Sequence, residues 1–361
     1  MPAKIVRVDP LNIDLEKMRE AADVIIRGGL VAFPTETVYG LGCDALNRDA
    51  ARRVFEVKRR PVDNPLIIHV KDFDQLNLVA REIPEKAYKL IKRLWPGPLT
   101  LILPRRREIP LETTGGLDTV AVRSPAHPVA LKLIELSERP IAAPSANISG
   151  RPSPTKAEHV IEDLYDSIDM IIDSGETLFG LESTIINILT SPPTLLRPGA
   201  YPVEVIEEIL GERVYIPDFA RGLGEAERTL APGTRYRHYA PKTPLVVVEA
   251  REYNEQNIDL IASELIKLVR RYHERYKRLG IIATRETLER MREVLLEGVR
   301  IYEIGRRNNL YEIARNVFDL LRRLDKENIE IAFIEGVEER GIGLSIMNRI
   351  RKASTERVIV G

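Results

Sequence analysis

The chain of 361 residues is long enough for two domains, and its 44% hydrophobic and 30% charged residues are typical of a globular protein. Lys plus Arg and Asp plus Glu both number 54, which argues against a protein that binds nucleic acid through a strongly basic surface. The single cysteine, Cys43, excludes an internal disulfide and a cysteine-based metal cluster. No apolar run approaches the ~20 residues of a membrane span. We therefore expect a cytoplasmic protein without membrane contact.

The first half mixes helical and strand patterns. Asp14 predicts the N-cap of a helix whose apolar stripe runs from Leu15 to Ile26 and stops before Gly28. Thr155 with Glu158 predicts a capping box for a later helix. Other helices are predicted at 50–58 and 85–94, and strands at 31–33, 66–70, 99–103, 120–122, 170–172, 184–188 and 194–196. This irregular order predicts a large, twisted mixed sheet with helices packed on it.

From residue 245 onward, strands and helices alternate regularly. Strands are predicted at 245–248, 280–283, 299–302 and 329–334, with the longest helix at 257–277. Such alternation predicts a smaller Rossmann-like parallel α/β domain, although the G-x-G-x-x-G fingerprint is absent after its first strand. The predicted division is therefore a catalytic α/β domain at 1–216, a linker at 217–244 and a second α/β domain at 245–361.

The predicted linker is rich in glycine and proline, so it should contain no long regular elements. A passive linker would be small and polar, but this one also contains Arg235, Tyr236, Arg237, His238 and Tyr239. We therefore expect it to act as a lid over a site.

Polar side chains follow or border many of the predicted strands in the first half. Residues 34–42 combine hydroxyl groups with glycines, and 58–66 combine three basic residues with prolines. Arg123 and Arg197 each end a strand, and the run 142–154 offers serines and an asparagine. Alternatives remain for each segment taken singly: a tight turn for 34–42, a helix-dipole complement for Lys58, a surface ion pair for Arg123 and a simple Ser/Pro loop for 142–154.

Together these donors favour substrates rich in phosphate and carboxylate groups. The sequence has no Walker A pattern, no nucleophile elbow and no His/Cys metal cluster. Catalysis would then depend on positioning and charge neutralisation rather than on a covalent nucleophile.

Seven segments in order resemble the Sua5/YrdC family of threonylcarbamoyl-AMP synthases. They are Thr35–Gly42, Lys58–Pro61 with Asn64–Leu66, Trp95–Thr100, Val122–Arg123, Pro144–Asn147 with Ser149–Gly150, Glu182–Thr184 and Arg197–Gly199. The rest of the chain is similar to the longer, two-domain Sua5 form: Pro232–Pro241 matches its linker motif, and Gly341–Ile350 matches its C-terminal motif with Ser345 replacing the usual Ala. The resemblance implies a YrdC-like first domain and a Sua5-type second domain.

The resemblance also implies a reaction. L-Threonine, bicarbonate and ATP would give L-threonylcarbamoyl-adenylate and pyrophosphate, with Mg²⁺ carried by the nucleotide rather than held by a protein metal site. The product would pass to the tRNA threonylcarbamoyl-transferase machinery for t6A modification next to the anticodon, and a weak contact with tRNA is left open.

The residue roles implied by the resemblance fall into three sets. The catalytic set is Lys58, Arg60, Ser145 and Asn147. The threonine-binding set is Thr37, His69, Arg123, Ala143 (through its backbone) and Ser183. The ATP-binding set is Arg60, Asn64, Thr119, Ser145, Ser153, Arg197 and, from the linker, Tyr236.

Three rival functions were weighed against this one. An RNA-binding module would need a basic surface and aromatic stacking motifs, which the composition and sequence do not favour. A carbamoyl-transfer enzyme of the hydrogenase-maturation type would need zinc-finger cysteines, and the chain has one cysteine. A regulatory nucleotide sensor is the third alternative.

Overall fold

Two units make up the chain in the computed structural model, which describes residues 2–227, 229–232, 238–291 and 297–361. Unit 1 contains Met1–Ser149, Ser153–Ala220 and Gly224–Tyr236, and unit 2 contains Gly150–Pro152, Arg221–Leu223 and Arg237–Gly361. No helix in the described parts of the chain is both long and apolar enough to cross a membrane.

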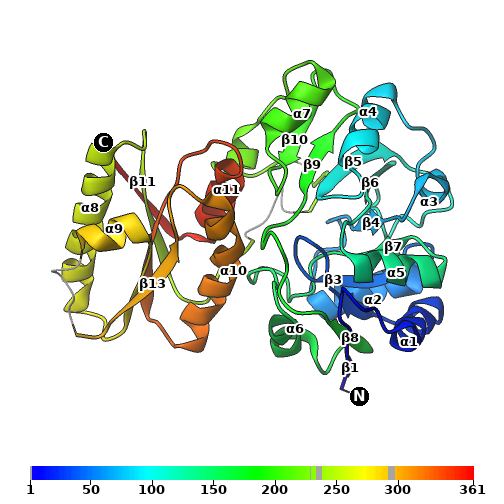
Figure 1. Ribbon diagram of the computed structural model, residues 1–361, viewed down its shortest axis with the longest axis horizontal. Helices are drawn as coiled ribbons and strands as arrows, with labels where there is room; N and C mark the ends of the chain where they lie inside the picture. Colours follow the sequence, from blue (N-terminus) through cyan, green and yellow to red (C-terminus); the bar gives the residue numbers. More distant parts are fainter. Residues whose placement is uncertain (1, 228, 233–237, 292–296) are drawn as a thin grey trace. The chain divides into compact units, whose positions relative to one another are not determined.

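Unit 1 is an α/β structure built on a ten-stranded mixed sheet (Figure 1). Its strands, in sheet order, are β1 (Lys4–Arg7), β8 (Met170–Asp173), β2 (Val31–Phe33), β3 (Gly40–Asp44), β7 (Ile141–Ala142), β4 (Ile67–His69), β6 (Thr119–Arg123), β5 (Leu99–Pro104), β9 (Thr184–Asn187) and β10 (Thr194–Arg197). Its helices are α1 (Leu15–Ile26), α2 (Arg48–Lys58), α3 (Phe73–Val79), α4 (Glu85–Leu94), α5 (Pro128–Ser137), α6 (Ala157–Leu164) and α7 (Val203–Leu210), and the 3-10 turn Asp218–Arg221 follows.

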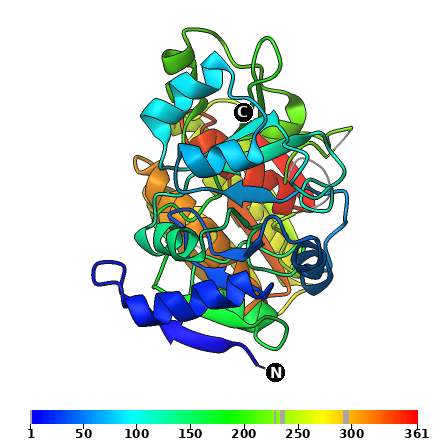
Figure 2. The ribbon, with the colours of Figure 1, turned by 90° about the vertical axis from the view of Figure 1, so that its right-hand side faces the viewer.

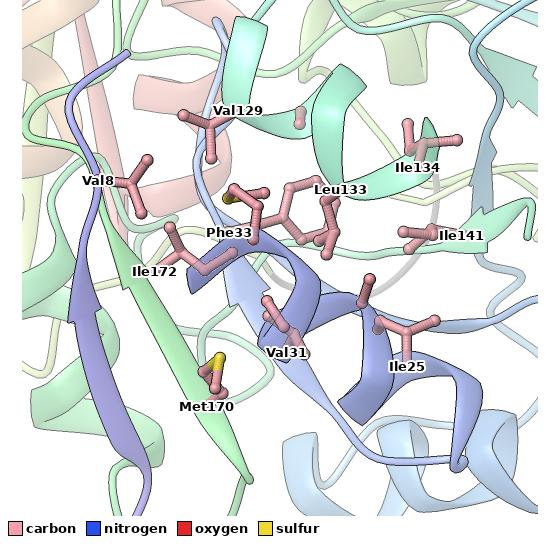
Figure 3. Close-up of a cluster of buried hydrophobic side chains, with 14 of the residues drawn as sticks. Val8, Ile25, Val31, Phe33, Val129, Leu133, Ile134, Ile141, Met170 and Ile172 are labelled. Carbon is pink, nitrogen blue, oxygen red and sulfur yellow. The ribbon is translucent and has the colours of Figure 1, made fainter. Parts of the chain in front are cut away.

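One core of unit 1 lies between the sheet and helices α1 and α5. Ile25 of α1 and Leu133 of α5 are fully buried together with Phe33 of β2, Ile141 of β7 and Ile172 of β8 (Figure 3). Helix α1 presents this apolar face because its hydrophobic residues recur at helical spacing. Its predicted N-cap is confirmed, since the Asp14 side chain accepts hydrogen bonds from the amides of Glu16 and Lys17. Strand β1 and helix α1 lie at the same edge of the unit, near the N-terminus (Figures 1 and 2).

The seven strands predicted for the first half are confirmed, but β1, β3 and β7 were not predicted. Strand β3 escaped prediction because its glycines resemble a loop. A Cβ atom at Gly42 would lie 2.7 Å from the Phe33 ring and 2.8 Å from Ile141, so glycine is required there by side-chain packing across the strands.

The capping box predicted for Thr155 and Glu158 is wrong. Helix α6 begins at Ala157, and its N-cap is Lys156, which makes no side-chain cap. Thr155 is fully buried and lies one position too early to reach the free amides of the first turn.

Unit 2 contains an all-parallel sheet in the order β13-β12-β14-β11-β15. Its elements are β11 (Leu245–Ala250), α8 (Glu255–His273), β12 (Leu279–Thr284), α9 (Arg285–Arg290), β13 (Val299–Gly305), α10 (Leu310–Lys326), β14 (Ile331–Glu335), α11 (Gly343–Ala353) and β15 (Glu356–Val360). The pair α8 and α9 and the pair α10 and α11 cover opposite faces of this sheet (Figure 1). The parallel α/β prediction is confirmed, while β15, an edge strand in which no residue is buried, was not predicted.

Candidate active site

Lys58 ends helix α2 and is buried, with 1% of its surface exposed. The helix stops there because Arg59 adopts a left-handed backbone conformation with φ 51° and Pro61 follows. The Lys58 ammonium donates to the carbonyl oxygen of Ser145 at 2.5 Å and to that of Asn147, while the Ser149 amide donates to the Lys58 carbonyl at 2.9 Å. Lys58 therefore holds the 145–149 loop and places a positive charge beneath it.

Arg60 is organised by the turn that follows it. Its Nε donates to the backbone oxygen of Asn64 at 3.0 Å, and its NH2 group donates to the Asn64 side-chain oxygen at 2.7 Å and to the Pro65 carbonyl at 3.0 Å. Asn64 stands just before β4, and Thr119 begins the parallel neighbour β6. These two predicted ATP residues therefore lie at the amino ends of their strands, whereas Arg123 ends β6.

Arg123, Thr37 and His69 come together as one group. The Arg123 NH1 group donates to the Thr37 hydroxyl at 3.1 Å, and β4–β6 pairing places His69 directly beside Arg123. Thr37 is fixed in turn by a 2.7 Å hydrogen bond between its hydroxyl and that of Thr35. All of these side chains are buried, so they form a polar group shielded from solvent at one end of the strand pair.

Glu36 is the counter-charge of Arg123. Both carboxylate oxygens accept from the Arg123 NH2 group, at 2.8 and 2.9 Å, and one also accepts from the Ala126 amide at 3.1 Å. The two side chains are only 4% and 6% exposed. Because this buried ion pair joins both carboxylate oxygens to one guanidinium nitrogen, and Thr37 accepts from the other, Glu36 helps to fix how the guanidinium is oriented.

Burial controls the protonation of this group. Loss of solvent, together with the positive charge of Arg123, lowers the pKa of His69 to about 3, so the imidazole is neutral at pH 7. Burial also lowers the pKa of Arg123, and the Glu36 carboxylate opposes that shift. A neutral imidazole beside a paired guanidinium can exchange hydrogen bonds with a hydroxyl group while the cation binds a carboxylate.

Ser183 and Arg197 form the neighbouring wall. The Ser183 hydroxyl lies 2.8 Å from that of Thr100, and Arg197 NH2 donates to it at 3.1 Å and to the Ser183 carbonyl at 3.0 Å. Strand β5 pairs with both β6 and β9, which brings Thr100 and Ser183 to the same end of the sheet as Arg123. A Cβ atom at Gly199 would lie 2.1 Å from the Thr184 amide nitrogen, so only glycine permits this approach.

The serine-rich loop is joined to the segments around it. Ser145 forms an isolated bridge with Gly40, and the amide of Ala146 donates to the Tyr39 carbonyl at 2.8 Å. Ala143 continues from β7 and donates to the Ile67 carbonyl at 2.8 Å. The fold thus places Ser145 and Asn147 over the Lys58 ammonium.

Ser153 is directed toward another part of the site. Its hydroxyl donates to the Glu182 carboxylate at 2.6 Å, and Glu182 immediately precedes Ser183. The buried hydroxyl oxygens of Ser124 and Ser149 have no hydrogen-bond partner among the described residues, which leaves two polar atoms available to a ligand.

Sequence reasoning assigned no role to Glu36, Thr100 or Glu182. All three lie inside the motifs that supported the family resemblance, and each bonds directly to a predicted binding residue. Their positions within these motifs could have indicated a role, but the hydrogen bonds between motifs far apart in the sequence are seen only in the folded structure. Tyr236, predicted to reach ATP from the linker, lies outside the described residues.

Part of the predicted linker packs on unit 1. Ala231 is fully buried against Ile67, Ile102 and Leu196, with Leu230 beside it. The Pro232 carbonyl accepts a long hydrogen bond of 3.5 Å from Arg197. This stretch is therefore anchored next to a predicted ATP-binding residue.

Both halves of the chain match known family models. A model of the Sua5, YciO and YrdC proteins, described as "Telomere recombination", matches residues 23–199. A second model, "Threonylcarbamoyl-AMP synthase, C-terminal domain", matches residues 201–355. A threonylcarbamoyl-AMP synthase of Pyrococcus abyssi is 50% identical, with 96% of this chain and 97% of that protein covered. The chain belongs to the Sua5 family of threonylcarbamoyl-AMP synthases.

Other Sua5 relatives agree over the same length. The threonylcarbamoyl-AMP synthase of Bacillus subtilis is 41% identical and covers 97% of this chain, with 96% of its own length matched. A crystal structure of P. abyssi Sua5 complexed with L-threonine has a TM-score of 0.91 and 49% identity, with 99% of both chains covered. The Sua5 resemblance inferred from the motifs is thereby confirmed, together with the two-domain α/β fold.

Proposed function

We propose that this chain synthesises L-threonylcarbamoyl-adenylate from L-threonine, bicarbonate and ATP. The observation that carries the proposal is the presence in one unit of two groups: the buried group of Arg123, Thr37 and neutral His69, and a cationic group of Lys58 and Arg60. One group has the chemistry to bind an amino acid with a hydroxyl, and the other the chemistry to bind phosphates. The relatives' activity and the threonine bound to P. abyssi Sua5 support the same assignment.

In the threonine site, Arg123 binds the substrate carboxylate. Thr37, His69 and Ser183 surround the rest of the amino acid, and the Ala143 backbone contributes a polar contact. Glu36 and Thr100 position Arg123 and Ser183 through the hydrogen bonds already described. Since each binding group is held by a buried partner, little reorganisation is needed when threonine binds.

In the nucleotide site, the phosphates interact with Arg60, Ser145, Ser153 and Arg197, and Asn64 and Thr119 contribute to binding the remainder of ATP. Mg²⁺ would be supplied by the nucleotide rather than by a protein metal site, and would neutralise part of the phosphate charge. The role of Tyr236 in ATP binding, and of 217–244 as a lid, stays a prediction from the family resemblance. A variant truncated before residue 230 should bind threonine but yield less product, and undiminished synthesis would contradict the lid.

The reaction balances without a covalent enzyme intermediate. The threonine amine adds to bicarbonate with loss of water to give a carbamate, whose oxygen attacks the α-phosphorus of ATP while the bond to pyrophosphate breaks. Lys58 and Arg60 stabilise the negative charge that develops at the α-phosphate, and Ser145 and Asn147 orient the reacting groups. The product then passes to the tRNA threonylcarbamoyl-transferase machinery.

Pyrophosphate release tests this proposal directly. Protein is mixed with ATP, Mg²⁺ and labelled bicarbonate, and each amino acid is added in turn. We expect release, and labelled adenylate, with threonine, and much less with serine or valine, each of which lacks one of the substituents of the threonine side chain. Release that does not depend on threonine, or that does not require bicarbonate, would contradict it.

A further inference from the structure

Unit 2 contains a cavity of about 760 Å³, within the ~300–1,000 Å³ range of small-molecule sites. Its wall is formed by 249–254 after strand β11, by 337–340 after strand β14, and by Arg351, Arg357 and Ile359. No part of the proposed reaction uses these residues.

The cavity lies where the topology of a parallel sheet favours ligand binding. Strands β11 and β14 are parallel neighbours, but β11 leads to α8 and β14 to α11, on opposite faces of the sheet (Figure 1). Loops that diverge in this way leave a crevice beyond the carboxyl ends of the two strands. Gly336 borders the crevice, and a Cβ atom there would lie 2.7 Å from the Tyr253 hydroxyl and 2.8 Å from the Glu249 Cβ, so the strand ends approach closely.

A network of charges, buried at Glu249 and Arg351, forms part of the wall. Glu249, only 2% exposed, accepts from Arg351 at 2.6 and 3.0 Å and from Arg357 at 2.5 Å. Arg351 also pairs with Glu339 at 2.5 Å, and Arg221 pairs with Glu339 at 2.6 Å. The wall as a whole has four arginines and four glutamates, so its formal charges balance, and Arg221 joins the network from outside the wall.

Several hydrogen-bond donors around the cavity wall have no acceptor within the described parts of the chain. Arg357 uses only its Nε, and the exposed side chains of Arg251 and Arg340 form no ion pair. The backbone amides of residues 338–340 also have no acceptor there. Guanidinium groups and free amides on a loop that leads into a helix are suited to phosphate oxygens.

We propose that this cavity binds a nucleoside phosphate, separately from the site in unit 1. The phosphate contacts Arg251, Arg340 and Arg357. The exposed carboxylates of Glu252 and Glu338 on the same wall accept hydrogen bonds from the sugar hydroxyls or the base amino group. These acceptors favour a nucleotide over inorganic phosphate, because inorganic phosphate has neither a sugar nor a base to donate to them.

Equilibrium dialysis of the full chain with labelled ATP tests the proposal. We expect two sites per chain in the wild type and one in Arg251→Ala/Arg340→Ala, whose exposed side chains can be removed without disturbing the Glu249 network. Arg271→Ala is the matched control, because Arg271 is also exposed and lies on α8 outside the cavity wall. Arg357→Lys, which keeps the charge but not the guanidinium, should weaken the second site by about tenfold or more.

The results separate this inference from the proposed function. Arg60→Ala should remove the unit 1 site and threonine-dependent pyrophosphate release while leaving the cavity site, whereas the Arg251→Ala/Arg340→Ala variant should keep the unit 1 site. A single site in the wild type, or two sites of unchanged affinity in Arg251→Ala/Arg340→Ala, would overturn the cavity proposal. Inorganic phosphate displacing labelled AMP from the cavity as well as unlabelled AMP does would overturn the nucleoside assignment.

Discussion

Replacing Glu36 with glutamine tests how the proposed threonine site is held together. The substitution keeps the size of the side chain but removes the charge that binds Arg123 through two contacts of 2.8 and 2.9 Å. A hydrogen bond to a charged group contributes about 1.5–3 kcal/mol, and the glutamine oxygen can still accept one bond. Loss of the second hydrogen bond allows the Arg123 guanidinium to turn away from the substrate carboxylate.

The expected effect is specific to one substrate. With ~1.5–3 kcal/mol lost, kcat/KM for threonine should fall about 10- to 150-fold, mainly through a higher KM, while KM for ATP changes less than about threefold. Pyrophosphate release at varied threonine and at varied ATP measures both. Some stability should also be lost, because the buried Arg123 keeps its charge with a weaker partner.

Glu335→Gln is a matched control, since Glu335 is 1% exposed and is paired with Arg307 in unit 2. It should lower the unfolding temperature without changing the KM for threonine. An unchanged KM for threonine in Glu36→Gln, or an equal rise in both KM values, would refute the positioning role of Glu36.

Three further predictions concern other parts of unit 1. Lys58→Met should reduce adenylate synthesis at least about 100-fold, because the ammonium that bonds the Ser145 carbonyl is lost, and Lys58→Arg should not restore it; near-normal synthesis by either variant would contradict this. Because the pKa of His69 is lowered to about 3 in the folded chain, the unfolded state binds a proton first as pH falls below about 6.5. The free energy of unfolding should therefore fall between pH 6.5 and 3 by about 1.4 kcal/mol per pH unit. His69→Asn should reduce this pH dependence, measured by urea unfolding at pH 7 and 5, and an unchanged pH dependence would show that His69 is not the group responsible. Gly199→Ala should abolish activity or folding, since the new methyl group would overlap the Thr184 backbone, and a fully active, equally stable variant would exclude that close approach.

The sequence predicted the periodic elements well because burial imposes a regular pattern on them. The helix capped by Asp14 and the apolar strand ending at Arg123 are examples in which local chemistry and tertiary packing agree. Strand β3 was not predicted, because the reason for its glycines is the Phe33 ring on the adjacent strand. The need for glycine is set by a side chain on another strand, so it cannot be recognised from the residues next to the glycine.

In the candidate site, too, the sequence predicts some features, and others are seen only in the fold. The motifs predict that Lys58 and Arg123 bind substrate, and residue type alone indicates anionic ligands. The hydrogen bonds from the Lys58 ammonium to the 145–147 backbone, and the pairing of Arg123 with Glu36, required the fold, because they join segments more than 80 positions apart. The positions at the amino ends of β4 and β6 likewise follow from strand direction, which composition does not specify.

The place of β1 at the sheet edge has a consequence for synthesis on the ribosome. Lys4 pairs with Met170, so β1 has no partner in this sheet until β8 has been made. At ~5–20 residues per second, that interval lasts about 8–33 s. During this interval the unpaired β1 could pair with a strand of another nascent chain. Lys4 and Arg7, both exposed on β1, oppose such pairing through their charge. The charges on β1 therefore reduce association between chains before β8 is available.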